Sequence, residues 1–530
     1  MALTKKKTTF IDELSIVESG PRRPQDPLYD AVRLRPPTTE GSRERFLASD
    51  PSPALELTRI PLVARLVRSR RFQFFLILPN QLIFWSVIFL GVLGSADPGL
   101  NFATAITWYL WFCVVFVLMA TMGRGWCAMC PFGGFGEWIQ RHTFWTRTQK
   151  ALGLGKKLPS RWAGYGFLIS TGTFIVLTFL EEFFNIAGPG APYLTSFMVL
   201  GIVGSATASF LIFERRTFCR YICPLSSLVG TVGSMGAVAG FRTKDREVCL
   251  SCETKDCMRG GADGFGCPWY TWPGSSDSNL YCGLCSECYK ACPQDNVGLF
   301  LQPPLTSVIA PRRRRFDIAW AVTALWGLVL FQQINALSFF GRLDDWLNSH
   351  LNFPHYPNPI DFLGFIALFA IATAAVSWGI GQIFARRDLS FSGTGSFLGR
   401  TSRFRSFFMP VSYALIPVMG ADYFARQLPK LFNHVTRLVP AIEHIFGLGS
   451  GADSSLYSLK LLSDPQIVML QVGVIALGTV ASAWAGWRIA RRDLVPISRN
   501  ALAVQATTVT FTLVCGAGAA LLYVLMHAAE

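Results

Sequence analysis

The chain has 530 residues, of which 51% are hydrophobic, and it carries a formal net charge of +15. This composition is too apolar for a single water-soluble domain and favours a membrane protein. The positive charge does not indicate a nucleic-acid-binding protein, because no basic recognition helix or stacking platform is apparent. Arginines beside apolar segments instead suit anionic lipid headgroups. We expect membrane lipid, and no nucleic acid, as a partner.

The first 70 residues are polar and contain several prolines. A basic run, Lys5–Lys7, lies near the start, but no apolar stretch follows it. The segment therefore does not have the organisation of a cleaved signal peptide. We predict that residues 1–70 form a cytoplasmic, partly disordered tail.

Nine apolar segments are long enough, at about 20 residues, to cross a bilayer as helices. They cover residues 73–95, 102–122, 163–183, 193–213, 317–340, 361–384, 406–424, 466–488 and 501–526. The seventh has the weakest pattern, because it is short and contains Pro410 and Pro417. The segments predict an all-α multi-pass membrane protein.

Arginine and lysine are concentrated in alternate connections between these spans. Basic residues precede the first span and lie between the second and third, the fourth and fifth, the sixth and seventh, and the last two. The connections 95–101 and 185–192 are nearly free of them. Positive residues stay on the cytoplasmic side, so we expect a cytoplasmic N-terminus and a C-terminus on the opposite, outer side.

Two cysteine pairs follow the predicted inner ends of the second and fourth spans. The motif GWCAMCP carries Cys127 and Cys130, and FCRYICP carries Cys219 and Cys223. Proline cannot donate a helical hydrogen bond, so the chain should turn at each motif and present sulfur atoms at the membrane edge. Because the two spans run in the same direction, we expect the four sulfurs to meet in one metal site.

Three interpretations of these four cysteines remain open. Four thiolates suit an iron–sulfur cluster or a single soft metal ion. The spacing of Cys127 and Cys130 is also that of a redox-active dithiol. The third interpretation is four buried thiols that only pack. Two further cysteines, Cys113 and Cys515, lie alone within spans and are expected to act as small apolar residues.

The connection between the fourth and fifth spans holds eight more cysteines. They are Cys249, Cys252, Cys257, Cys267, Cys282, Cys285, Cys288 and Cys292. The last four form a Cys-x2-Cys-x2-Cys-x3-Cys-Pro run, which is the bacterial pattern for a 4Fe–4S cluster, and in two-cluster ferredoxins the fourth cysteine ligates the other cluster. We therefore predict two clusters, one held by Cys249, Cys252, Cys257 and Cys292, and the other by Cys282, Cys285, Cys288 and Cys267.

Zinc and disulfides are the alternatives for this segment. Zinc sites favour two separated Cys-x2-Cys pairs or added histidines, and no histidine occurs between His142 and His350. Disulfides need an oxidising compartment, whereas the charge pattern predicts that this segment is cytoplasmic. The first cluster is the less regular, because four residues separate Cys252 from Cys257.

Polar residues near the predicted outer membrane face are candidates for quinol chemistry. Glu181 and Glu182 end the third span, and carboxylates at an apolar boundary can accept protons. An interfacial end to the span explains the pair at least as well. Weaker candidates lie inside spans: Asp422, Gln332, Gln333 and Asn335. We do not expect haem at His434 and His444, because both lie on one predicted amphipathic interfacial segment, without facing ligands.

These features predict four parts. They are a tail (1–70), a four-helix membrane domain with both Cys-Pro motifs (71–241), a two-cluster ferredoxin domain (242–310) and a C-terminal membrane domain of about five helices (311–530). The expected fold is an all-α multi-pass membrane protein, with about nine transmembrane helices and an inserted small α+β ferredoxin-like cytoplasmic domain.

The paired motifs WCAMCPFGGFGEW and FCRYICPLSSL, followed by the ferredoxin run, resemble the membrane polyferredoxin family. This family includes NapH-type subunits of periplasmic nitrate reduction, the NosR maturation protein and FixG/CcoG-type proteins. The resemblance covers residues 73–340. It implies a bacterial inner-membrane electron carrier or redox subunit between the quinone pool, or a cytoplasmic donor, and a reductase or maturation system. The outer side would then be the periplasm. The alternative is a redox-sensing or metal-reducing maturation factor for a respiratory metalloenzyme.

Overall fold

The computed structural model describes residues 55–144, 152–159, 162, 164–187, 191–261, 263–311, 314–351, 357–386, 403–448 and 451–529. Most of the predicted tail, residues 1–54, lies outside this part of the chain. So do some of the arginines that contribute to the predicted orientation, such as Arg312, Arg313, Arg387 and Arg400.

Within the described residues, nine helical segments are long and apolar enough to cross a membrane, which confirms the number predicted. They are α5 (Arg70–Leu93), α6–η2–α7 (Phe102–Met122), α11 (Gly166–Phe183), α12 (Pro192–Ile212), α18 (Phe316–Ile334), α20 (Pro359–Phe384), α21–α23 (Arg403–Ile445), α25–η8 (Asp464–Ile497) and α26 (Ala501–Ala529). The protein is therefore a mostly helical membrane protein.

The seventh segment differs most from its prediction. It was expected over residues 406–424, but it extends over 43 residues and contains α21 (Arg403–Ala414), α22 (Ile416–His434), η5 (Val435–Arg437) and α23 (Leu438–Ile445). Pro417 lies in the first turn of α22, where its missing N–H costs no hydrogen bond, so it starts a new helix after Leu415. Pro417 therefore divides the segment without ending it, whereas Pro410 lies inside α21.

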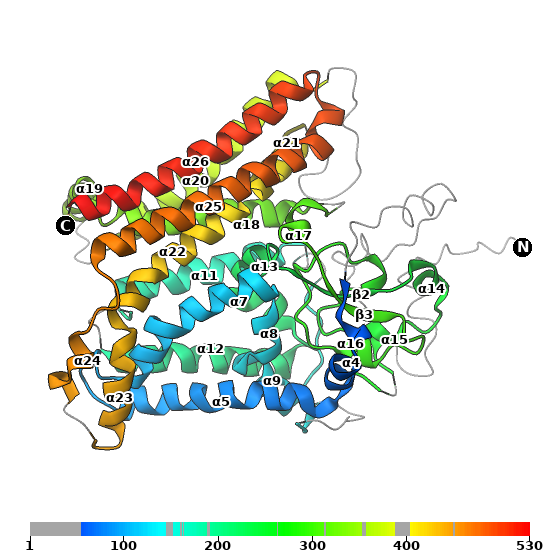
Figure 1. Cartoon of the computed structure of the whole chain (residues 1–530), viewed down its shortest axis with the longest axis horizontal. Helices are drawn as coiled ribbons and strands as arrows, with labels where there is room; N and C mark the ends of the chain where they lie inside the picture. Colours follow the sequence, from blue (N-terminus) through cyan, green and yellow to red (C-terminus); the bar gives the residue numbers. More distant parts are fainter. Residues whose placement is uncertain are drawn as a thin grey trace, which may run out of the picture.

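The helices run side by side and alternate in direction, so their connections gather at two ends (Figure 1). One end carries the strands β2 (Val238–Thr243) and β3 (Val297–Leu301) with the short helices α14 (Arg246–Ser251), α15 (Asp256–Arg259) and α16 (Glu287–Lys290). The opposite end carries α19 (Ser338–Leu351), α23, α24 (Ser455–Ser458) and the C-terminus. The described arginines near the cysteine motifs, such as Arg124 and Arg216, belong to the connections at the strand end.

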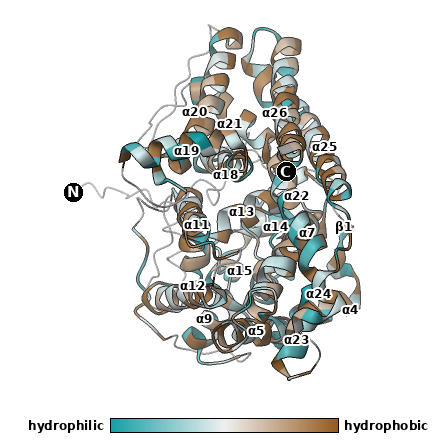
Figure 2. Ribbon diagram, turned by 90° about the vertical axis from the view of Figure 1, so that its left-hand side faces the viewer, coloured by the Kyte–Doolittle hydropathy of each residue, from teal (hydrophilic) through white to brown (hydrophobic). Residues whose placement is uncertain are grey.

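Helix α18 forms the centre of the membrane part. In its most apolar stretch 83% of the residues are buried, against 22% in α26 and 28% in the α25 segment. Trp326 and Phe331 of α18 are fully buried in the main core. The outer helices keep apolar side chains such as Leu477 and Leu502 exposed. Figure 2 shows long brown, hydrophobic stretches along these helices. Such a surface suits lipid, which solvates apolar groups as well as a protein core does.

A small antiparallel sheet lies at one end of the helices. Its strand order is β1 (Leu55–Glu56), β3 (Val297–Leu301), β2 (Val238–Thr243). The chain between β2 and β3 carries α14 (Arg246–Ser251), α15 (Asp256–Arg259) and α16 (Glu287–Lys290). The pairing of β2 with β3 therefore closes a loop that contains all eight cysteines of the predicted two-cluster segment.

Residues 55–68, which were included in the predicted tail, pack against this sheet. After β1 come η1 (Leu57–Arg59) and α4 (Pro61–Arg68). The backbone N–H of Leu299 donates to Thr58 Oγ1 at 3.2 Å, and Lys244 lies 3.4 Å from the Glu56 carboxylate. This segment is therefore ordered, and it connects the sheet directly to α5.

Candidate metal centres

The first predicted ligand set lines one pocket beside α14 and α15. Its residues are Cys249, Cys252, Cys257 and Cys292. Asn296 holds two of these sulfurs, because its backbone N–H donates to Cys292 Sγ at 3.3 Å and its Nδ2 donates to Cys249 Sγ at 3.4 Å. Hydrogen bonds to sulfur are typical of cluster-binding thiolates, since they stabilise negative charge on the ligand. Here we name this group the outer set.

The second ligand set lies beneath the sheet. Cys267, Cys285 and Cys288 are buried, and Cys282 is half-buried against β2. The backbone N–H groups of Thr271 and Phe241 donate to Cys267 Sγ and Cys282 Sγ, both at 3.4 Å. The second bond depends on the close approach of β2 to Cys282. Glycine at position 240 allows this approach, since a Cβ there would lie only 2.7 Å from Cys282 Sγ. We call these four cysteines the middle set.

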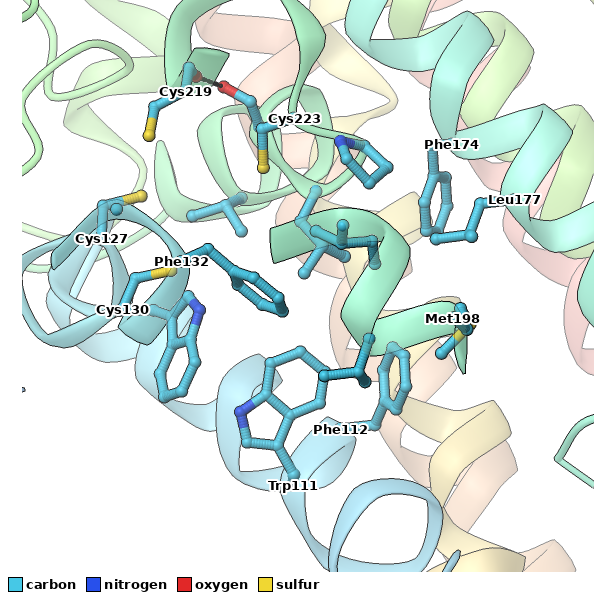
Figure 3. A pocket seen from close by; sticks show the side chains of 18 of the residues that line it. Trp111, Phe112, Cys127, Cys130, Phe132, Phe174, Leu177, Met198, Cys219 and Cys223 are labelled. Atoms are coloured by element: carbon cyan, nitrogen blue, oxygen red, sulfur yellow. Dashed lines mark hydrogen bonds between the residues drawn. The ribbon is translucent and has the colours of Figure 1, made fainter. Parts of the chain in front are cut away.

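The two Cys-Pro motifs bring their cysteines together at the membrane edge (Figure 3). Cys127 lies in α8 (Gly125–Met129) and Cys219 in η3 (Phe218–Ile222). Cys130 and Cys223 follow these helices with nearly the same backbone, φ −67° and ψ 125° against φ −53° and ψ 120°. All four line one cavity of about 90 Å³. We call them the membrane-edge set.

Prolines and glycines explain this local geometry. Pro131 begins α9 (Pro131–Arg141), and Pro224 precedes α13 (Leu225–Gly233), so each motif ends one helix and starts another. Helix α9 packs closely on α12, because a Cβ at Gly136 would lie 2.3 Å from the Phe210 ring. The same helix brings Gly133, three residues after Cys130, beside Cys219, whose Sγ would lie 3.6 Å from a Cβ at Gly133.

The cysteine sets form neither disulfides nor a single-ion site among the described residues. All fourteen cysteines are free thiols. Among the described residues, no group of three or more His, Cys, Asp or Glu side chains could hold one metal ion. A single tetrahedral zinc ion needs its sulfurs roughly 3.8 Å apart, given Zn–S bonds of about 2.3 Å. A 4Fe–4S cluster separates its thiolates further, because each binds a different iron.

Burial of these cysteines disfavours the negatively charged thiolate form. It raises the pKa of the Cys130 and Cys267 thiols to about 11 and also raises the pKa of Cys219, Cys257 and Cys288. Neighbouring cysteines add to the increase; for Cys288 they are Cys267, Cys285, Cys282 and Cys257. Thiolates at these positions need positive charge, which iron supplies when bound. The donor sets therefore fit 4Fe–4S clusters.

The three sets share one continuous core. Cys219, Cys257, Cys267 and Cys288 belong to the same buried cluster, and Cys127, Cys223, Cys282 and Cys292 pack against it. Trp269, two residues after Cys267, also lines the cavity of the membrane-edge set. The middle set thus lies between the other two sets.

Sequence reasoning missed the buried charges beside these cysteines. Arg124 and Arg216 are each only 1% exposed. Arg216 donates to both carboxylate oxygens of Glu137, at 2.8 and 2.7 Å. Burial alone would raise the pKa of Glu137, but Arg141 and Arg216 lower it to about 2. The signal was present in the sequence, because an arginine precedes the first cysteine of each Cys-Pro motif by three residues.

The polar candidates for quinol chemistry divide into two groups at the opposite end of the helices. Glu181 lines a pocket of about 70 Å³ together with Gln332, Arg426 and Lys430. Glu182 accepts hydrogen bonds from Gln332 Nε2 at 2.8 Å and from Arg426 at 3.0 Å.

Asp422 belongs to the second group and is completely buried. It accepts hydrogen bonds from Gln333, from Trp326 Nε1 at 3.3 Å and from the Tyr523 hydroxyl at 3.1 Å. Asn335 only ends α18. His434 packs against the ring of Tyr109, with centroids 5.0 Å apart, and His444 lies in α23.

The fold is that of a membrane protein, and its cysteines gather in three sets. The family model described as "4Fe-4S binding domain" matches residues 104–155 and 195–239. The two stretches contain the complete membrane-edge set but not the outer and middle sets. No curated protein and no solved structure matches the chain. The protein is therefore a 4Fe–4S iron–sulfur protein of the membrane, which fits a membrane electron carrier.

Proposed function

We propose that this protein transfers single electrons through three 4Fe–4S clusters, one at each cysteine set, between a membrane quinol and an acceptor at the sheet end. The observation that carries the proposal is the continuous core formed by the three sets. Clusters bound there supply one-electron redox chemistry. The protein contributes fixed spacing, hydrogen bonds to sulfur and exclusion of water.

Two facts support a cluster at the membrane-edge set in addition to the two predicted from the ferredoxin run. The matched 4Fe–4S stretches contain all four of its cysteines. Those cysteines also surround a cavity of about 90 Å³. The dithiol interpretation of Cys127 and Cys130 is less favoured, because Cys219 and Cys223 complete the same cavity. We infer that the electron route runs from the membrane-edge set through the middle set to the outer set.

The pocket beside Glu181 supports a quinol as the electron donor. The pocket beside Glu181 and the membrane-edge cavity share Phe112, Phe174, Leu177 and Met198. An apolar space with a few polar groups at one end suits an apolar molecule with a polar head. Oxidation of a quinol to a quinone releases two protons and two electrons. Glu181 would accept these protons one at a time and pass each to solvent, while the two electrons move singly toward the cysteines. The acceptor would be a reductase or another redox partner protein.

The proposed orientation places the sheet end in the cytoplasm and the C-terminus in the periplasm of a bacterial inner membrane. It is supported by the positive residues at the sheet end, which the positive-inside rule assigns to the cytoplasm. The region between β2 and β3 would then be a cytoplasmic, ferredoxin-like cluster domain.

The decisive experiment combines metal analysis with quinol reduction. Anaerobically purified protein should contain about twelve iron atoms and about as many acid-labile sulfides per chain, if all three sets hold clusters. Adding a quinol should reduce the clusters, as followed by EPR spectroscopy. If quinol does not reduce the clusters but the protein reduces cupric ion, the result would contradict the proposed electron carrier. It would favour the alternative of a metal-reducing maturation factor.

We expect Glu181→Gln to slow reduction by quinol by about 100-fold, which is the lower range for removal of a general base. Reduction by dithionite, which needs no proton acceptor, should be unchanged. Glu443→Gln is the matched control, because Glu443 lies in α23 and does not line the pocket. Equal quinol rates in the two variants would rule out Glu181 as the proton acceptor.

A further inference from the structure

Each membrane-edge motif is preceded by a buried arginine. Arg124 stands three residues before Cys127, and Arg216 stands three residues before Cys219. Both side chains are 1% exposed. A guanidinium keeps its charge at every pH at which proteins fold, so both are buried cations. Arg216 pairs with a carboxylate, whereas Arg124 contacts only neutral groups.

The charge of Arg216 is compensated by a carboxylate. Its guanidinium makes the two-pronged contact with Glu137, and Nη1 also donates to the carbonyl oxygen of Cys127 at 3.0 Å. Such a pair is close to neutral when viewed from a neighbouring site. Glu137 additionally accepts a hydrogen bond from Arg141 at 3.2 Å.

Arg124 has neutral partners instead. It donates to the carbonyl oxygen of Ser226 at 2.8 Å, to Ser226 Oγ at 3.2 Å and to the carbonyl oxygen of Leu280. Its guanidinium lies 4.7 Å from the centroid of the Trp269 ring. Within the described part of the chain, no carboxylate forms an ion pair with it. A buried cation without a counter-charge is strongly unfavourable, so this position calls for an anion nearby.

The contacts of Arg124 join the membrane-edge set to the middle set. Ser226 lies three residues after Cys223, and its hydroxyl donates to the carbonyl oxygen of Cys219 at 2.6 Å. On the other side, Leu280 lies two residues before Cys282, and Trp269 two residues after Cys267. The guanidinium therefore acts on both sites.

We propose that Arg124 is a positioning residue shared by the membrane-edge and middle clusters, whose uncompensated charge raises the reduction potentials of both. This inference rests on the proposed function, because it assigns a cluster to each set. A four-thiolate cluster is anionic, and reduction adds one more negative charge. A fixed cation in a buried site stabilises the reduced form more than the oxidised form. The outer set has no such contact with Arg124.

Redox titrations of the three clusters, followed by EPR, test the proposal. In Arg124→Gln we expect the reduction equilibria of the membrane-edge and middle clusters to shift at least tenfold toward the oxidised form, which is about 59 mV for one electron. The reduction potential of the outer cluster should not change. Arg124→Lys should keep both reduction potentials close to those of the unaltered protein, because lysine retains the positive charge.

Glu137→Gln provides a second test with the opposite sign. It leaves Arg216 without its carboxylate, so the potentials of the membrane-edge and middle clusters should rise. This variant can be measured if Arg124→Gln does not fold, because it tests the premise that an uncompensated buried cation raises these potentials. Unchanged potentials in a folded Glu137→Gln would overturn that premise. Unchanged potentials in a folded Arg124→Gln, or equal shifts in all three clusters, would overturn the proposal. If iron analysis finds only about eight atoms per chain, the third cluster of the proposed function fails. The middle cluster still tests Arg124 in that case.

Discussion

Replacing Cys223 by serine should remove about four of the roughly twelve iron atoms expected per chain. A serine hydroxyl is a poor ligand for iron, and all four cysteines of the membrane-edge set are needed for one cluster. Metal analysis and EPR of the anaerobic protein would measure the loss. The clusters of the outer and middle sets should remain, because no residue of their ligand sets is changed.

Cys113→Ser is the matched control for this prediction. Cys113 is also buried and lies in α7 of the span that leads to the first motif, but it is not part of any of the three sets. Its substitution should leave the iron content unchanged. Equal iron content in Cys113→Ser and Cys223→Ser would mean that the membrane-edge set holds no cluster and that its cysteines have another role.

Replacing Cys267 by serine should interrupt the proposed electron route at its centre. Cys267 is the distant fourth ligand of the middle set, so its loss should remove that cluster. We expect quinol to reduce the membrane-edge cluster but no longer the outer cluster on the time scale of the unaltered protein. Stopped-flow optical spectroscopy combined with freeze-quench EPR would follow the two clusters separately.

Dithionite distinguishes a broken route from a damaged protein in this experiment. A small soluble reductant reaches the outer cluster directly, so it should still reduce that cluster in Cys267→Ser. If quinol reduced the outer cluster of this variant at the normal rate, electrons would not pass through the middle set. The serial arrangement would then be wrong, even if all three clusters were present.

The sequence predicted those parts of the structure that depend on local pattern. The nine spans follow from length and hydropathy alone, and the structure has nine such segments among the described residues. The proximity of Cys127 and Cys130 to Cys219 and Cys223 followed from the equal direction of two spans, and all four now line one cavity.

Features that depend on long-range contacts could not be predicted. The pairing of Leu55 with Leu301 joins residues almost 250 positions apart, and nothing in the local sequence identifies that partner. The contact of Arg124 with Leu280 is of the same kind. The length of the seventh span is hard to predict for another reason, since Pro417 resembles a helix break in the sequence but lies in the first turn of a new helix.

The strand β1 and helix α4 fasten the cluster-bearing region to the membrane helices. Arg68 at the end of α4 forms an ion pair with Asp295, and its guanidinium lies 5.1 Å from the ring centroid of Tyr289 in α16. Two residues later the chain enters α5. The region is therefore anchored through α5 as well as through α12 and α18. It does not hang from a single connection, so the acceptor of the proposed electron route would have to bind at the sheet end.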